Sequence, residues 1–180
     1  TEIIPTSGYR SLDEQKKLYE NSLIENGKAF TEAYVALPNH SEHQTGLAID
    51  LAINEDNIDL IRPNFPNYGV SGRFKELCFE YGFIERYTKG KETITRINAE
   101  EWHFRYVGYP HSKIMSSLNL CLEQYHDYIK KFKYKENPFI FENYEISYLA
   151  YQENISVILN DYEEYSGNNI DGFIFTRYIQ

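Results

Sequence analysis

Two short groups of residues in this chain have the types and spacing needed for metal chemistry. His43 and Asp50 supply an imidazole and a carboxylate, and Glu100 and His103 supply another pair about fifty residues later. Two histidines and one acid can bind a zinc ion and leave one position open for water. The second acid is then free for proton transfer. This composition predicts a catalytic metal site and a metal-dependent hydrolase.

The chain must turn sharply between the first two candidate ligands. In a straight strand, His43 and Asp50 would lie roughly 23 Å apart, whereas each ligand atom lies only about 2.0–2.2 Å from a zinc ion. Thr45 and Gly46 supply the turn, because glycine adopts a positive φ without strain. Taken alone, the two residues also fit a loop histidine and a buried hydrogen-bond acceptor.

Asp50 is the charged residue of an otherwise apolar segment, 47–53, which has the length of a buried strand. An isolated buried carboxylate is unfavourable unless it is paired or bound to a metal. The apolar character of this segment therefore predicts that Asp50 is paired with another side chain or bound to a metal.

The second group belongs to an expected strand that includes 102–107. Side chains alternate across a strand, so His103 and Arg105 would share one face and Glu100 would point to the other. Glu100 can act beside His103 only if the chain bends or bulges between them. By alternation alone, Glu101 is the nearer candidate for the base.

Other charged groups near these positions are less decisive. Arg10, in a loop before a helix, is a candidate to stabilise an oxyanion; the alternative is an exposed loop arginine. His40 could compete as a ligand, whereas His111 and His126 are typical of surface or capping residues.

Periodicity and capping residues predict the elements that position these groups. Ser11 and Glu14 form a capping box at the start of a helix that ends at Gly27. Further along we expect a helix beginning at Ser71, a strand over 83–87, a return strand over 93–97 and a helix over 112–132.

The whole-chain composition excludes several classes of protein. The 180 residues have 42% apolar content, which predicts a packed globule. The formal net charge of -9 argues against a nucleic-acid partner, whose phosphates require a basic surface. No apolar run approaches the roughly 20 residues that span a bilayer. Cys78 and Cys121 are expected to be buried free thiols.

The composition changes toward the end of the chain, where Tyr and Ile become frequent. Phe139–Tyr151, Ile155–Leu159 and Ile170–Tyr178 have the character of strands. We therefore expect a catalytic domain over residues 1–135 and a small β-rich extension over 136–180. The aromatic residues of the extension fit sheet packing, with a carbohydrate-binding surface as the alternative.

The metal-binding pattern resembles the signature of the LAS metallopeptidases, a group that includes VanX, VanY, lysostaphin-type enzymes and hedgehog domains. The motif is Ser41-x-His43-x-x-Gly46-x-Ala48-x-Asp50, followed by Glu100-x-x-His103. The VanY and VanXY branch is most similar, through matches at Ser7–Arg10, Val35–Pro38, Tyr81–Ile84 and Trp102–Gly108. The resemblance covers roughly residues 3–131.

This resemblance implies one Zn²⁺ ion per chain, held by His43, Asp50 and His103. It also implies that Glu100 is the general base, although Glu101 stands where the group often has proline. The implied fold is α+β: a small, mostly antiparallel sheet with packed helices and a zinc cleft, followed by the β appendage.

Further roles come from the same resemblance. Arg10 would stabilise the transition state, and Gln15 and Ser41 would bind the substrate. The implied activity is that of a zinc D,D-peptidase acting on D-Ala-D-Ala or on the terminal D-Ala of peptidoglycan stem peptides, which would give resistance to glycopeptide antibiotics such as vancomycin.

The alternatives differ in substrate, location and catalysis. The segment 21–37 resembles the VanXY form, which favours dual activity and a cytoplasmic location. A VanY-like carboxypeptidase would instead act outside the cell, with a membrane anchor beyond this sequence. A zinc-bearing module without catalysis, as in hedgehog proteins, is disfavoured by the presence of Glu100 and Arg10.

Overall fold

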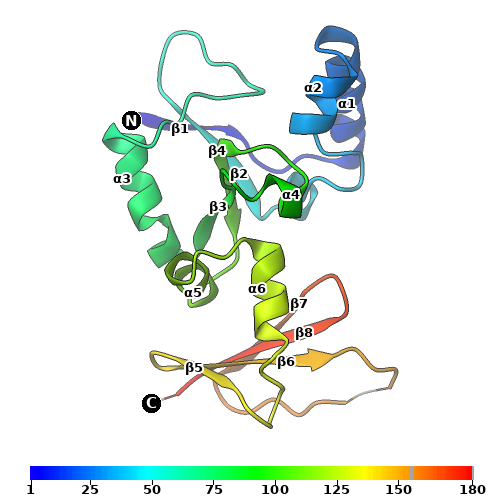
Figure 1. Ribbon diagram of the computed structural model, residues 1–180, viewed down its shortest axis with the longest axis vertical. Helices are drawn as coiled ribbons and strands as arrows, with labels where there is room; N and C mark the ends of the chain where they lie inside the picture. The colour runs from blue at the N-terminus through cyan, green and yellow to red at the C-terminus, as the bar shows by residue number, and fades with distance from the viewer. Residues whose placement is uncertain (155, 180) are drawn as a thin grey trace. The chain divides into compact units, whose positions relative to one another are not determined.

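The computed structural model describes residues 1–154 and 156–179, which form two compact units, Thr1–Cys121 and Leu122–Gln180 (Figure 1). The division falls just before a helix, earlier in the chain than the boundary predicted after residue 135.

An antiparallel sheet organises the first unit, all of whose residues are described. Its strands are β1 (Ile3–Ser7), β2 (Ala48–Ile53), β4 (Glu100–Tyr106) and β3 (Phe83–Tyr87), in that spatial order. Every neighbouring pair is antiparallel. This arrangement confirms the predicted α+β fold and the strands expected over 47–53 and 83–87.

Helices cover both sides of this sheet. Helices α1 (Leu12–Glu25) and α2 (Lys28–Tyr34) lie to one side, and α3 (Gly69–Cys78) lies to the other (Figure 1). The predicted capping box is present, because the Ser11 hydroxyl accepts from the Glu14 amide and the Glu14 carboxylate accepts from the Ser11 amide. The shorter helical elements are η1 (Glu42–Thr45), η2 (Phe79–Tyr81), α4 (Glu92–Thr95) and α5 (His111–Ser117).

Alternation along the central strands separates the core from the polar face. Leu51 and Phe104 face α3 and pack with Phe65 in a buried cluster. The Phe104 ring meets the rings of Phe65 and Phe74 edge-on, at centroid distances of 5.5 and 5.0 Å. Because side chains alternate, the residues next to Leu51 and Phe104 in sequence point to the opposite face.

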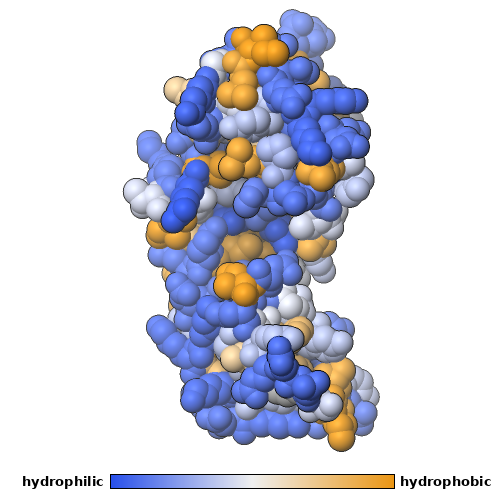
Figure 2. Space-filling model, turned by 90° about the vertical axis from the view of Figure 1, so that its right-hand side faces the viewer, coloured by the Kyte–Doolittle hydropathy of each residue, from blue (hydrophilic) through white to orange (hydrophobic). Residues whose placement is uncertain are grey.

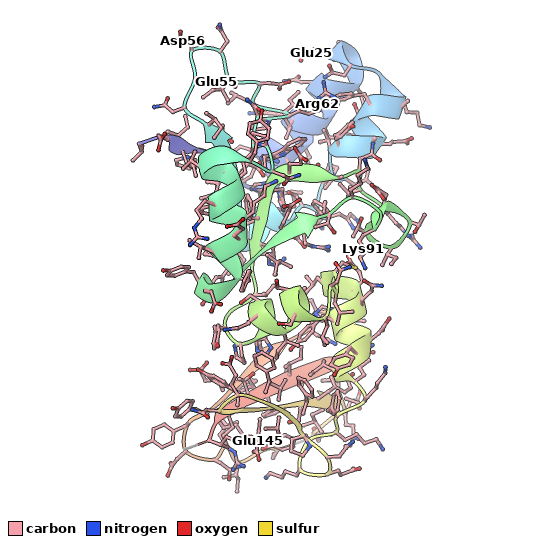
Figure 3. All side chains as sticks on the ribbon, turned by 60° about the vertical axis from the view of Figure 1, so that its left-hand side comes forward. Glu25, Glu55, Asp56, Arg62, Lys91 and Glu145 are labelled. Atoms are coloured by element: carbon pink, nitrogen blue, oxygen red, sulfur yellow. The ribbon has the colours of Figure 1, made fainter. Side chains whose placement is uncertain are left out.

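The long loop between β2 and α3 returns toward α2. Figure 3 shows Glu55 and Asp56 at its outer end and Arg62 on the returning part. The Arg62 guanidinium lies over the rings of Phe30 and Tyr34, at 5.5 and 5.6 Å from their centroids. These cation–π contacts attach the loop to α2.

The expected return strand was wrong, and one expected helix begins at another residue. The return strand over 93–97 is the short helix α4, whose amide groups bond locally, as from Arg96 to the Glu92 carbonyl. Local hydrogen bonding there outweighed the β-propensity of Thr and Ile. The helix expected from Ser71 begins at Gly69, and the Ser71 hydroxyl donates to the Pro66 and Tyr68 carbonyls.

The helix expected over 112–132 is interrupted. It consists of α5 and α6 (Leu122–Ile129). Asn119 has a φ of 50°, and the amides of Asn119 and Leu120 bond to the carbonyls of Ser116 and Met115. This is the Schellman pattern, in which a left-handed residue ends a helix. The interruption coincides with the division between the two units.

The second unit contains α6 and an antiparallel sheet. Among its described residues the strand order is β5 (Phe139–Phe141), β6 (Tyr144–Ala150), β8 (Gly172–Tyr178) and β7 (Glu163–Gly167). Ile146 and Tyr125 are buried in its core. Of the strand expected over Ile155–Leu159, Ile155 lies outside the described residues and 156–159 has no strand.

The surface is mainly polar. The face in Figure 2 shows apolar residues in separate patches on a largely hydrophilic background, in agreement with the mean hydropathy of -0.58. No helix in the described parts of the chain has the length and apolar character needed to cross a membrane.

Gly82 is a point at which the fold requires glycine. Its φ is +86°, and an added Cβ would lie 2.6 Å from the Tyr106 ring and 3.2 Å from the Gly108 Cα. We expect Gly82→Ala to lower the free energy of unfolding by about 2–4 kcal/mol, from backbone strain plus overlap. Gly90→Ala is a matched control, with a φ of +87° and open space, and should lose only about 1–2 kcal/mol. Equal losses in urea unfolding would contradict the packing argument.

Candidate active site

A cleft of about 500 Å³ lies on the polar face of the first sheet. Its walls come from β1, α1, η1, β2, β4 and the loop after β2. The structure brings all seven predicted site residues to this cleft: Arg10, Gln15, Ser41, His43, Asp50, Glu100 and His103.

The three predicted metal ligands converge at the bottom of the cleft. Asp50 and His103 are direct cross-strand partners on β2 and β4. One oxygen of Asp50 lies 2.9 Å from the Nδ1 of His103, and the other lies 3.2 Å from the Nε2 of His43. One ligand atom from each residue lies within 4.8 Å of the others. The pairing of two strands and one turn therefore assembles the group.

The turn after η1 aims His43 at Asp50. Gly46 has a φ of 72°, which confirms the predicted turn. The Nδ1 of His43 lies 2.7 Å from the Gly8 carbonyl. A carbonyl can only accept, so Nδ1 carries the proton and Nε2 presents its lone pair to the site.

The environment of this group suits a divalent cation. His43, Asp50 and His103 are all buried. Burial alone would raise the pKa of Asp50, but the hydrogen bond from His103 and the nearby His43 ring lower it well below its usual range. Burial alone would lower the pKa of His103, yet its hydrogen bond with Asp50 and the nearby carboxylate of Glu42 raise it to about 9. The metal-free site thus keeps a proton that a cation would displace. Two imidazole nitrogens and one carboxylate oxygen form a donor set that fits zinc.

A β-bulge places Glu100 beside this group. Glu85 of β3 pairs with Phe104, but Tyr87 pairs with Glu100, so β4 holds extra residues between the two pairs. The Oε2 of Glu100 consequently lies 3.9 Å from the Nδ1 of His103. The predicted bend between Glu100 and His103 is confirmed, and it takes the form of a bulge.

The carboxyl group of Glu100 is poised to exchange protons. Burial raises its pKa to about 8; the positive charges of His103 and Arg10 oppose this shift, and the negative charges of Asp50 and Glu42 add to it. A bound dication would lower the pKa again. A carboxyl that titrates near neutral pH is suited to general acid–base work.

Glu101 points away from the cleft. Its Oε1 accepts a hydrogen bond from the Asn67 side chain at 2.8 Å, and Asn67 in turn accepts from Lys75 of α3. The extra residues of the bulge put Glu100, and not Glu101, on the side of His103. Alternation alone had placed Glu101, and not Glu100, on the side of His103.

Arg10 is held with its guanidinium next to the metal group. Its Nη2 lies 4.0 Å from Asp50 and donates to the Ser7 hydroxyl at 2.7 Å, and its Nη1 donates to the Gln15 side-chain oxygen at 2.8 Å. Burial lowers the pKa of Arg10, while the charges of Asp50 and Glu100 raise it. Arginine remains cationic under such shifts, so the cleft holds a fixed positive charge.

Gln15 and Ser41 line the cleft in different ways. Gln15 is 1% exposed, and its amide nitrogen donates to the Ala36 carbonyl at 2.7 Å. With its oxygen bound by Arg10, the observed contacts of Gln15 hold that arginine in place. Ser41 precedes η1 and is 8% exposed. Substrate contacts of Gln15 and Ser41 stay predictions.

A second layer of charged residues, which the sequence patterns did not predict, lies behind the three candidate ligands. The Oε1 of Glu42 lies 2.8 Å from the Nε of Arg86 and 3.1 Å from the Nη1 of Arg105. Burial alone would raise the pKa of Glu42, but the nearby His103 ring and the two arginines lower it to about 2. The one clue to this layer in the sequence was the expectation that Arg105 and His103 share a strand face.

His40, His111 and His126 are not members of the metal-binding group found among the described residues. From the sequence alone, His40 could have competed as a metal ligand.

Fold and site together define a metallopeptidase domain of the LAS type. The family model for VanY, described as D-alanyl-D-alanine carboxypeptidase, matches residues 1–109. The chain is also 49% identical over 123 residues to the bifunctional D-Ala-D-Ala dipeptidase and carboxypeptidase VanXYC of Enterococcus gallinarum, covering 68% of this chain and 65% of that protein. The chain belongs to the VanY family.

Solved structures agree with this assignment. The vancomycin resistance D,D-dipeptidase VanXYg, in complex with a D-Ala-D-Ala phosphinate analog, has a TM-score of 0.94 and 50% identity, covering 98% of this chain and 73% of its own. A mutant of the vancomycin resistance D,D-pentapeptidase VanY, in complex with Zn(II), has a TM-score of 0.58 and 32% identity, covering 69% and 71%. The chain spans between 46% and 65% of the lengths of the curated relatives it matches.

The raised pKa of Glu100 predicts a pH-dependent stability of the metal-free protein. The folded chain holds this proton more tightly than the unfolded chain, since the pKa is shifted from 4.5 to about 8. As pH rises through this window, the unfolded chain loses the Glu100 proton before the folded chain does, so the free energy of unfolding falls. Glu100→Gln should become more stable than the parent, by on the order of a few kcal/mol at pH 8.5.

Urea unfolding between pH 5 and 8.5 measures this effect, with chelator present throughout. The stability gap between Glu100→Gln and the parent should widen as pH rises, whereas Glu101→Gln should show no such trend. A gap that is constant across the range would contradict the assigned burial of the Glu100 carboxyl.

Proposed function

We propose that this chain is a zinc-dependent D,D-peptidase that hydrolyses D-Ala-D-Ala and removes the terminal D-Ala from peptidoglycan pentapeptide precursors. The observation that carries the proposal is the position of the Glu100 carboxyl, 3.9 Å from the His103 ring of the converging His43, Asp50 and His103 group. The similarity to VanXYC and VanXYg supports the substrate class.

His43, Asp50 and His103 would hold one zinc ion. A bound zinc ion would act as a Lewis acid that activates water and polarises the scissile carbonyl. The buried donor set supports this assignment, although the ligand types alone also allow other divalent ions.

Glu100 would carry the proton through the reaction. Its Oε2 faces the site and can remove a proton from the attacking water. The same carboxyl can then deliver the proton to the nitrogen of the leaving D-alanine. A carboxyl with a pKa shifted toward neutral pH can perform both halves of this transfer.

Arg10 would stabilise negative charge that develops on the carbonyl oxygen. Its guanidinium is fixed by Ser7 and Gln15 before any substrate arrives, so no reorganisation is needed during the reaction. Gln15 would act mainly by holding Arg10. Ser41, on the cleft wall, remains our candidate for contact with the substrate carboxylate.

Loss of the terminal D-Ala would remove the group that glycopeptide antibiotics recognise, so vancomycin resistance is the proposed biological role. A cytoplasmic location belongs to the same proposal and is supported by the 49% identity to a bifunctional relative. A carboxypeptidase anchored outside the cell is the alternative. A non-catalytic zinc-bearing module is disfavoured by the observed positions of Glu100 and Arg10.

Release of D-alanine from free D-Ala-D-Ala and from a pentapeptide precursor tests the proposal. We expect both substrates to be cleaved, chelator to stop the reaction and added zinc to restore it. Glu100→Gln should lower kcat by about 10²–10⁴-fold, because a general base is removed. Glu101→Gln should retain parental activity, since Glu101 points toward Asn67.

Three outcomes would change this proposal. A zinc-loaded parent that cleaves neither substrate would refute the enzyme assignment. Cleavage of the pentapeptide alone would favour the VanY-like carboxypeptidase. An inactive Glu101→Gln variant beside an active Glu100→Gln variant would reverse the assignment of the base.

A further inference from the structure

Glu42 is a buried carboxylate that the proposed reaction does not use. It precedes His43 in sequence, yet its side chain reaches the far side of the His103 ring. The Oε2 of Glu42 lies 3.5 Å from the Nε2 of His103. The other ring nitrogen, Nδ1, faces Asp50 at 2.9 Å. The imidazole of His103 therefore lies between two carboxylates.

Neither of these facing atoms is satisfied elsewhere. Within residues 1–154 and 156–179, the Oε2 of Glu42 and the Nε2 of His103 are both buried and have no other hydrogen-bond partner. Buried polar atoms are rarely left unpaired, because each lost hydrogen bond is unfavourable. A small adjustment of either side chain would bring the two atoms into a hydrogen bond.

Two arginines orient the carboxylate of Glu42. Arg86 of β3 and Arg105 of β4 both contact its Oε1. With one oxygen engaged by two guanidinium groups, the second oxygen is directed at His103. Glu42 therefore presents an acceptor, and only an acceptor, to the Nε2 of that ring.

We propose that Glu42 is a positioning residue that accepts a hydrogen bond from the Nε2–H of His103 and so directs the Nδ1 lone pair of that ring to the metal. The inference rests on the zinc site proposed above. A neutral imidazole carries one N–H, so a proton held at Nε2 leaves Nδ1 free to bind. A carboxylate behind a histidine ligand also increases its basicity.

A purely structural role would have different consequences. Glu42 also joins η1 to two strands of the sheet through Arg86 and Arg105. If it served only as this connection, its loss would reduce stability and leave the intrinsic affinity for zinc unchanged. Measurements of zinc affinity and of which His103 nitrogen carries the proton therefore distinguish a positioning role from a purely structural one.

Glu42→Gln is the most informative substitution, because glutamine has nearly the same shape. Its single carbonyl oxygen would be taken by the two arginines, which leaves the amide group facing the Nε2 of His103. Two donors cannot bond, so the ring would prefer its proton on Nδ1, where the metal must bind. We expect Glu42→Gln to weaken zinc binding by about 10–100-fold.

Glu85→Gln provides a matched control. Glu85 lies on β3 of the same sheet and forms a partly buried ion pair with Lys75 at 3.3 Å. It is not a member of the cleft lining. Zinc affinity, measured by competition with a chromophoric chelator, should stay within about twofold of the parent for this control. The melting temperatures of the metal-free variants establish that each one folds.

Nitrogen-15 NMR of the zinc-loaded parent gives a second test that needs no variant. We expect the Nε2 of His103 to carry a proton and the Nδ1 to show the shift of a metal-bound nitrogen. A metal-bound Nε2 in the parent, or equal zinc affinities for the parent and Glu42→Gln, would overturn this inference alone. A parent that binds no zinc would overturn both this inference and the proposed metal site.

Discussion

The structure of the first unit depends on one buried carboxylate in a central strand. Asp50 lies on β2 between β1 and β4, where desolvation opposes its charge. Its neighbours His43, His103 and Arg10 compensate for that cost, and each is brought there by a different element. The turn at η1, the pairing of β2 with β4 and the loop before α1 must all be correct for Asp50 to be tolerated.

One face of the first sheet packs in the hydrophobic core, and the other face lines the cleft. Leu51 and Phe104 pack against α3, while the residues next to them in sequence, Asp50 and His103, face the cleft. The packed core face therefore directly supports the residues that face the cleft. The bulge in β4 adds Glu100 to the reactive face without disturbing the core position of Phe104.

Charges in the first unit alternate outward from the ligands. The histidines contact Asp50, the His103 ring also faces Glu42, and Glu42 is bound by Arg86 and Arg105. Each buried charge thus meets an opposite charge or a polar ring, as the low polarity of the interior requires. Such a layered arrangement holds the three candidate ligands in place, and this pre-organisation would favour both metal affinity and catalysis.

The sequence by itself predicted the three candidate metal ligands, the turn at Gly46 and the buried position of Asp50, because these follow from residue type and local pattern. The α+β fold with its antiparallel sheet was also predictable, because the same motifs resemble the LAS metallopeptidases. The resemblance favoured Glu100 over Glu101, but only the tertiary structure decided which of the two side chains faces the cleft, since the bulge depends on how β3 pairs with β4. The contacts of Glu42, the break at Asn119 and the local bonding of α4 likewise arise from partners or backbone geometry that short-range patterns do not encode.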